Sequence, residues 1–140
     1  MTELTQRLLG FARADQILLN EPMSRHTTFR VGGPADVLFM PESGVQVARA
    51  LSEAEALGIR AVVIGNGSNL IVRDGGVRGL VIAIGEGMSE IARRGDTVEA
   101  QAGAALARVA AFAQAEGLAG LEFASGIPGT LGGEIGRAHV

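Results

Sequence analysis

A glycine-rich loop that directly follows a short apolar run is the first candidate for chemistry in this sequence. The loop is GNGSN at 65–69, and the run before it is AVVI at 61–64. Glycines let consecutive backbone N–H groups turn toward one concave point, and the Ser68 hydroxyl and the amides of Asn66 and Asn69 add neutral donors. The pattern predicts a nest for a phosphate or a diphosphate. The alternative interpretation is a plain tight turn, because Asn-Gly is a common hairpin signal.

A second glycine loop, SGIPGTLGG, occupies residues 125–133. Four glycines surround Pro128, so the backbone is rigid at the proline and free of side chains elsewhere. Such a backbone suits close approach to a flat or extended ligand. The alternative is an ordinary connecting loop, since clusters of Gly and Pro usually mark loops.

The amino-acid composition excludes several other kinds of chemistry. The chain has 140 residues and no Cys, and all twelve of its basic residues are Arg. Thiolate nucleophiles, thiolate metal sites, Schiff-base lysines and the P-loop lysine are therefore excluded. Trp and Tyr are absent and the net charge is −3, so we expect no nucleic acid as a partner. Redox chemistry would require a bound cofactor.

The remaining polar residues give weaker signals. His26 and His139 lie far apart in the sequence, so we expect neither a metal site nor a proton relay from them. Glu122 stands between two apolar residues and is interpreted as an edge residue, with a buried carboxylate of raised pKa as the alternative. No set of Ser, His and Asp has an interpretable spacing. The sequence therefore predicts no metal ligands.

Local patterns predict one α+β unit around the two loops. Ser43 precedes a helical stripe and Gly58 follows it, which is typical of an N-cap and a C′ residue. Apolar runs on both sides of this helix suggest a βαβ unit with parallel strands. We expect helices at 3–14, 44–57 and 104–116, and strands at 26–31, 36–40, 61–64, 70–72, 80–84 and 97–102.

No stretch of the sequence approaches the length of about 18 to 20 apolar residues that a membrane span needs. The N-terminus MTELTQRLLG also lacks the basic and apolar regions of a signal peptide. We therefore expect a cytoplasmic protein without a membrane partner. The sequence makes no prediction of the oligomeric state.

Three segments, taken in order, resemble the UDP-N-acetylenolpyruvoylglucosamine reductase family of peptidoglycan synthesis. They are NEPM with HTTFRVGGPAD at 20–36, IGNGSNLIVRDGGVRGLVI at 64–82, and AGAALARVAAFAQAEGLAGLEFASGIPGTLGG at 102–133. Either glycine loop alone is a weak signal, whereas the pair at this separation is specific. The resemblance covers residues 20–133 without a visible gap.

The resemblance implies an α+β FAD-binding domain of the vanillyl-alcohol oxidase and p-cresol methylhydroxylase type, built from two small lobes that hold the flavin between them. The first loop would wrap the FAD pyrophosphate, and the second would run along the ribityl chain and the ring. The implied cofactor-binding residues are Gly65, Asn66, Gly67, Ser68, Asn69, Leu70, Gly126, Ile127, Pro128, Gly129, Thr130, Gly132 and Gly133.

The resemblance also implies a reaction. In this family FAD accepts hydride from NADPH and passes it to the enolpyruvyl group of a UDP-sugar, and the protein supplies a proton. The product, UDP-N-acetylmuramate, serves peptidoglycan synthesis and with it cell shape and cell division. We expect FAD as cofactor, NADPH as hydride donor and a UDP-sugar as substrate.

The chain departs from the family pattern after its last double glycine. We divide it into a helical extension at 1–19, an incomplete FAD-binding domain at 20–133 that is truncated at its C-terminus, and a tail at 134–140 without a family counterpart. The tail matches the translation of a common sequencing adapter. The family's catalytic residues fall beyond this point, so we expect no catalytic residue in the chain and no turnover by it alone.

Two other functions share these sequence features. A flavin oxidase or dehydrogenase of the same fold would have a similar FAD nest. A non-catalytic module that binds a nucleotide or a phosphate would also need glycine loops. Titration with FAD and with UDP-sugars separates the alternatives, because a response to UDP-sugar without one to FAD favours the module.

Overall fold

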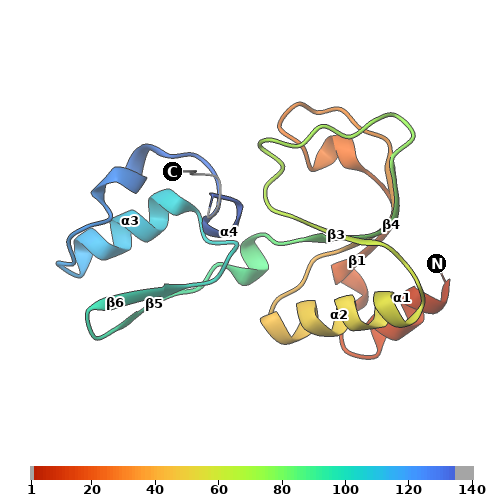
Figure 1. Ribbon diagram of the computed structural model, residues 1–140, viewed down its shortest axis with the longest axis horizontal. Helices are drawn as coiled ribbons and strands as arrows, with labels where there is room; N and C mark the ends of the chain where they lie inside the picture. The colour runs from red at the N-terminus through yellow and green to blue at the C-terminus, as the bar shows by residue number, and fades with distance from the viewer. Residues whose placement is uncertain (1, 135–140) are drawn as a thin grey trace.

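The computed structural model describes residues 2–134 and arranges them in two lobes joined by a short linker (Figure 1). The first lobe contains a four-stranded sheet and two helices, and the second contains a two-stranded sheet with its own helices. This is the two-lobed α+β arrangement that the resemblance implies. Residues 135–140, most of the expected tail, lie outside the described part of the chain.

The sheet of the first lobe has the order β1-β2-β4-β3. β4 runs parallel to both β2 and β3, whereas β1 is antiparallel to β2. The parallel strands expected on both sides of the 44–57 helix are present, and β4 lies between them. The strands are β1 (Ile17–Pro22), β2 (Pro34–Phe39), β3 (Ala61–Ile64) and β4 (Val77–Ala83).

Alternation along the central strands builds two hydrophobic cores, one on each face of the sheet. On β2, Val37 and Phe39 face the helices, while Leu38 between them faces the opposite side. On β4, Leu80 faces the helices and Val81 faces the opposite side. Successive side chains of a strand point to opposite faces, so both faces of these strands must be covered.

Helices α1 (Thr2–Leu9) and α2 (Gly44–Ala56) cover one face of the sheet (Figure 1). Ser43 caps α2 as expected, because its Oγ accepts a hydrogen bond of 3.2 Å from the Gln46 N–H. The predicted helix at 44–57 is confirmed. The predicted helix at 3–14 is shorter than expected, since α1 ends at Leu9. Two of its apolar side chains, Leu4 and Leu8, are fully buried in the core beneath it.

Two loops cover the other face of the sheet, and here two expected strands are absent. Residues 26–31 and 70–72 are loop. Thr27 closes a turn, accepting from the Arg30 N–H at 3.1 Å and donating from its Oγ1 to the Val31 carbonyl at 3.1 Å. Both edges of β2 are already paired, with β1 and β4, so residues 26–31 have no free edge of that strand to join.

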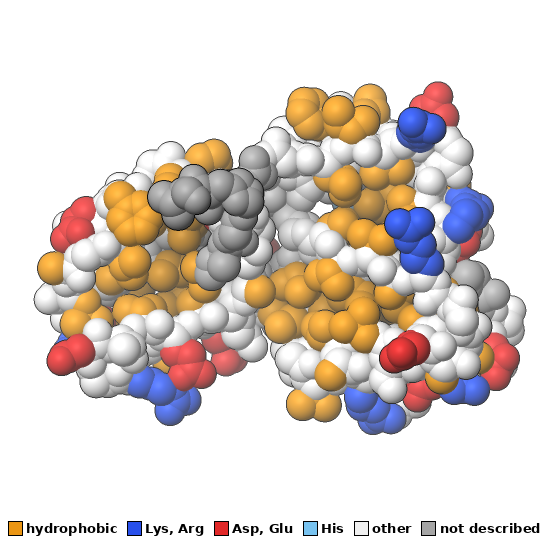
Figure 2. All heavy atoms as spheres, in the orientation of Figure 1, with side chains coloured by type: hydrophobic (Ala, Val, Ile, Leu, Met, Phe, Trp, Pro, Cys, Tyr) orange, Lys and Arg blue, Asp and Glu red, His pale blue; other side chains and the backbone are white. Residues whose placement is uncertain are grey.

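The two loops run side by side over the sheet. The Thr28 N–H donates to the Gly67 carbonyl at 3.1 Å, and the Gly33 N–H donates to the Arg73 carbonyl at 2.9 Å. Met23 and Val72 are buried beneath the loops. Figure 2 shows apolar side chains gathered at the loop end of this lobe. The exposed large apolar residues of the two loops are Phe29, Val31 and Ile71.

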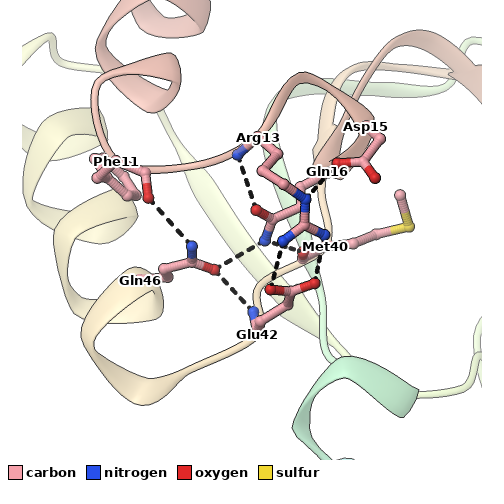
Figure 3. A network of polar contacts seen from close by, with 7 residues as sticks. All are labelled: Phe11, Arg13, Asp15, Gln16, Met40, Glu42 and Gln46. Carbon is pink, nitrogen blue, oxygen red and sulfur yellow. Dashed lines mark hydrogen bonds and ion pairs between the residues drawn. The ribbon is translucent and has the colours of Figure 1, made fainter.

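A buried glutamine joins the N-terminal segment to the start of α2 (Figure 3). Gln16 is 3% exposed, and its Nε2 donates to the Met40 carbonyl and to Gln46 Oε1, both at 2.9 Å. Gln46 Nε2 in turn donates to the Phe11 carbonyl at 3.2 Å. A buried amide is tolerated only when its donors and acceptors are paired, and these contacts pair both amides.

The second lobe pairs β5 (Ile91–Arg94) with β6 (Thr97–Ala100) as an antiparallel hairpin. Helix α3 (Leu106–Ala115), the 3₁₀ helix η4 (Glu122–Gly126) and the short α4 (Leu131–Glu134) complete it. A small apolar core formed by Leu106, Ala110 and Ala124 holds α3 against η4. The expected strand at 97–102 and helix at 104–116 are confirmed with shifted ends, whereas β1 and β5 have no counterpart among the expected strands.

The linker between the lobes contains the 3₁₀ helix η3 (Glu86–Met88) and packs on both sides. On the second lobe, the Gly103 N–H donates to the Met88 carbonyl at 2.8 Å, and a Cβ on Gly103 would stand 2.0 Å from the Gly85 carbonyl oxygen. On the first lobe, a Cβ on Gly87 would stand 2.9 Å from the Pro41 carbonyl oxygen. The lobes therefore meet through closely packed backbone.

Candidate functional site

The first glycine loop leaves the end of β3 and packs against the backbone of the 26–31 loop. Gly67 has a φ of +74°, and a Cβ at this position would stand 1.9 Å from the His26 carbonyl oxygen. L-residues rarely adopt this φ, and the neighbouring group is backbone that cannot rotate away. Position 67 therefore needs glycine for two independent reasons. The hydrogen bond from Thr28 to the Gly67 carbonyl fixes the same contact.

The same loop presents backbone donors. The Ser68 N–H donates to Asn66 Oδ1 at 3.2 Å, which turns the chain sharply. The N–H groups of Asn66 and Gly67 donate to no other group within residues 2–134. Backbone donors that are not used by the fold are the groups with which glycine loops bind anions.

The second glycine loop is held by hydrogen bonds of its own backbone. The Leu131 N–H donates to the Ala104 carbonyl and the Gly132 N–H donates to the Ala102 carbonyl, both at 2.9 Å. The Gly129 carbonyl accepts from the Leu106 N–H at 3.0 Å. These bonds bind the loop to the segment between β6 and α3, so its Leu131 and Gly132 amides are already engaged.

The two loops meet around a shared cavity of about 210 Å³. Thr130 forms its wall from the second lobe and is 8% exposed. A Cβ on Gly65 would stand 3.1 Å from Thr130 Oγ1, and a Cβ on Gly133 would stand 3.2 Å from the same atom. The absence of side chains at these two glycines keeps the space open on both sides of the hydroxyl. This cradle suits the diphosphate of a nucleotide cofactor.

Nine of the thirteen residues singled out in the sequence line the shared cavity, and four do not. Ile127 packs against the apolar core of the second lobe, and Gly132 packs on Ala102. Gly126 and Pro128 lie elsewhere on the loop. The nine lining residues are Gly65, Asn66, Gly67, Ser68, Asn69, Leu70, Gly129, Thr130 and Gly133.

A larger cleft of about 1050 Å³ adjoins the first loop at Gly65 and Asn66. Its other walls come from the segments 13–16, 24–30 and 40–42 and from the linker at 83–87. Arg13, at its edge, forms a hydrogen-bonded ion pair of 2.8 Å with Glu42 (Figure 3). This guanidinium lowers the pKa of the Glu42 carboxyl below its usual range. The two cavities share the first loop and together offer room for an elongated ligand.

Several residues of the larger cleft were not identified as site residues from the sequence. His26, Thr28 and Arg30 line it, and the sequence pattern places all three in a strand. Arg30 instead has a φ of +54°, which is uncommon for a residue with a side chain. The segment HTTFRVGGPAD carries part of the family resemblance, and that resemblance is the signal that points to them.

One carboxylate lines the shared cavity. Glu134 reaches it from α4, and its Oε1 lies 3.0 Å from the position that a Cβ on Gly129 would take. Among the described residues, no group of three or more His, Asp or Glu side chains is arranged to hold a metal ion. No helix in the same part of the chain is long and apolar enough to cross a membrane.

Comparison with known proteins identifies relatives in sequence and in structure. The UDP-N-acetylenolpyruvoylglucosamine reductase of Alkaliphilus oremlandii is 50% identical over 121 residues, which are 86% of this chain and 40% of that protein. The crystal structure of the Thermus caldophilus enzyme of this name is 32% identical, with a TM-score of 0.60 over 84% of this chain and 39% of that one. The chain thus spans about 40% of the length of such relatives.

A more distant structure shows the fold alone. p-Cresol methylhydroxylase is 15% identical, with a TM-score of 0.60 over 84% of this chain and 25% of its own. This likeness confirms the fold class expected from the sequence. The family model described as an FAD binding domain matches residues 35–139. This chain therefore belongs to the FAD-binding domain family.

Proposed function

We propose that the shared cavity binds the diphosphate of FAD and that the chain is the FAD-binding part of a UDP-N-acetylenolpyruvoylglucosamine reductase. The meeting of the two glycine loops around Thr130 is the observation that carries the proposal. The loops lie more than fifty residues apart in the sequence, and each comes from a different lobe. The sequence match to reductases of this name supports the choice of enzyme.

The protein's own groups would act on the cofactor as follows. Within residues 2–134 the N–H groups of Asn66 and Gly67 have no acceptor, so they can face a diphosphate, and the Thr130 hydroxyl can donate from the opposite wall. These neutral donors would stabilise the anion by hydrogen bonding, without a lysine. The adjoining cleft has Arg25 and Arg30 among its lining residues, and these cations favour an anionic ligand.

Bound FAD supplies hydride transfer, from NADPH to the enolpyruvyl group of the UDP-sugar. The residues described above bind and orient a cofactor. None of them is assigned a proton transfer to the substrate, so we propose that the remaining part of a full-length reductase supplies that proton and the sugar-binding surface. The proposed pathway is cytoplasmic peptidoglycan synthesis, and through it cell shape and cell division.

Titration of the purified chain with FAD tests the proposal. The chain lacks Trp and Tyr, so flavin absorption and quenching of flavin fluorescence are read against almost no protein background. We expect saturable binding of FAD and weaker binding of FMN, which lacks the diphosphate. Binding of UDP-sugar without binding of FAD would instead identify a nucleotide-binding module. We also expect no NADPH-dependent turnover of the enolpyruvyl sugar by this chain alone.

A further inference from the structure

His26 makes one contact with its side chain and a different one with its backbone. Its Nε2 lies 2.9 Å from Glu21 Oε1 at the end of β1. Its carbonyl oxygen lies against Gly67, where a Cβ would approach to 1.9 Å. The residue therefore connects a strand of the sheet to the loop that presents the uncommitted donors.

The contact between His26 and Glu21 is largely shielded from solvent, and the backbone of Glu21 is held in the sheet. The two side chains are 23% and 13% exposed. Glu21 is paired with Ala35 in the register of β1 and β2, so its backbone is fixed by the sheet. A hydrogen bond that is largely removed from water is stronger than an exposed one. The imidazole is thereby anchored to the four-stranded sheet of the first lobe.

The backbone of the same segment passes this anchoring to the first loop. The His26 N–H donates to the Met23 carbonyl at 2.9 Å, and two residues later the Thr28 N–H donates to the Gly67 carbonyl at 3.1 Å. Gly67 is thus held between the His26 carbonyl and the Thr28 amide. This clamp fixes the orientation of the peptide groups on both sides of Gly67.

We propose that His26, anchored by Glu21, is a positioning residue that holds the Asn66 and Gly67 donors in their ligand-binding arrangement. This inference rests on the proposed binding of FAD at the shared cavity. Glu21 lines neither the cavity nor the larger cleft. Its carboxylate also lies 3.8 Å from the Arg25 guanidinium, which does line the cleft. Loss of that ion pair would favour an anionic ligand, so weaker FAD binding in Glu21→Ala would act through His26 and the loop. That separation makes the proposal testable.

The FAD affinity of four variants and one control tests the connection between Glu21, His26 and the first loop. We expect His26→Ala and Glu21→Ala each to raise the Kd for FAD about tenfold, and the double variant to raise it no further, because both remove the hydrogen bond between His26 and Glu21. His26→Gln retains a side-chain donor toward Glu21, so it should restore most of the affinity. Glu3→Ala, which removes an exposed ion pair with Arg7 on α1, is the control and should leave the Kd unchanged.

Amide hydrogen exchange gives a second measurement that needs no ligand. The Thr28 amide should exchange faster in His26→Ala and Glu21→Ala, while the Leu80 amide in β4 keeps its protection. His26→Gln should again resemble the wild type. A variant that loses protection at both amides is destabilised as a whole, and the glutamine variant then carries the comparison.

Three results would overturn the inference. One is unchanged FAD affinity in His26→Ala, another is an effect of His26→Ala without any effect of Glu21→Ala, and the third is additivity in the double variant. The second result would mean that the imidazole contacts the ligand directly. Failure of the wild type to bind FAD would instead refute the proposed function, and the exchange rates at Thr28 would still decide whether the clamp exists.

Discussion

The two glycine loops that form the candidate site differ in what holds them. The first loop is clamped from outside, since Gly67 lies between the His26 carbonyl and the Thr28 amide. The second loop is fixed by donating its own N–H groups to Ala102 and Ala104. The first loop therefore keeps the Asn66 and Gly67 N–H groups available for a ligand. In the second loop, two N–H groups already donate to backbone carbonyls.

This difference assigns different tasks to glycines that look alike in the sequence. In the first loop, glycine allows close approach to backbone and a positive φ at residue 67. In the second, the atom nearest to a Cβ on Gly132 would be Cβ of Ala102 at 2.8 Å, with the Ala102 carbonyl oxygen at 3.2 Å. A backbone neighbour cannot be exchanged by mutation, but a side-chain neighbour can. The loops should therefore respond differently to the same substitution.

The largest effect is expected from Gly67→Ala. The added methyl meets the His26 carbonyl oxygen and imposes a φ of +74° on alanine, so the loop must move. We expect at least a tenfold rise in the Kd for FAD and a loss of stability greater than the roughly 1–2 kcal/mol of a left-handed residue alone. Isothermal titration and urea unfolding measure the two quantities.

Gly58→Ala is the matched control for this change. Gly58 has a φ of +66° after α2, and a Cβ there would meet nothing within 4 Å. It should lower the free energy of unfolding by about 1 kcal/mol and leave FAD binding unaltered. Equal effects of the two substitutions on FAD affinity would contradict the clamp at Gly67.

A smaller and repairable effect is expected from Gly132→Ala. The methyl group crowds Cβ of Ala102, and overpacking of this kind costs about 1–3 kcal/mol. Replacing Ala102 by glycine in the same chain removes the opposing methyl, so the double variant should recover much of the stability and the FAD affinity. Thermal unfolding with and without FAD measures the recovery. No recovery in the double variant would show that the second loop is also limited by backbone contacts.

Thr130→Val should change binding more than stability. Valine keeps the shape of threonine and removes the hydroxyl from the cavity wall. A hydrogen bond contributes about 1 kcal/mol net, so we expect a Kd for FAD that is raised by about fivefold. Thr97→Val removes a hydroxyl that donates to the Arg94 carbonyl in the β5–β6 turn, and this control should leave the Kd for FAD unchanged. Equal Kd values for the two variants would remove Thr130 from the site.

Local sequence signals predicted the parts of the molecule that depend on neighbours in the chain. The α2 helix follows from its apolar stripe and from Ser43 at its N-cap, and both are present. The strand expected at 26–31 is wrong, although its residue types favour a strand. A strand needs a free partner edge, and both edges of β2 are occupied. Such competition between segments is not visible in local pattern.

The same distinction between local sequence signals and long-range contacts applies to the candidate site. Glycine content identified both loops, since flexible backbone and close approach are properties of residue type. It did not identify His26 or Glu21, because the roles proposed for them depend on the contact of His26 with Gly67 in another loop. Only the fold brings that contact about. The family resemblance included His26 within a matched segment and so marked the region without giving its task.

The smallest effect, and one of opposite sign, is expected at the end of the second loop. Glu134 places a carboxylate on the shared cavity, and this charge opposes a diphosphate. Glu134→Gln keeps the size of the side chain and removes the charge, so FAD should bind about two- to fivefold more tightly, equivalent to less than about 1 kcal/mol.

Two comparisons test whether the effect of Glu134→Gln is electrostatic and local: a change of salt concentration, and the same substitution at another carboxylate. Repulsion between partly exposed charges is screened by ions, so the gain from Glu134→Gln should shrink as salt is raised from low to near-molar concentration. Glu122→Gln neutralises an exposed carboxylate of the same lobe that accepts from the Gly120 N–H, and should alter FAD affinity little at any salt. A gain that persists in high salt would mean that Glu134 acts through the shape of α4, and the second loop would then contribute geometry to the site but no charge.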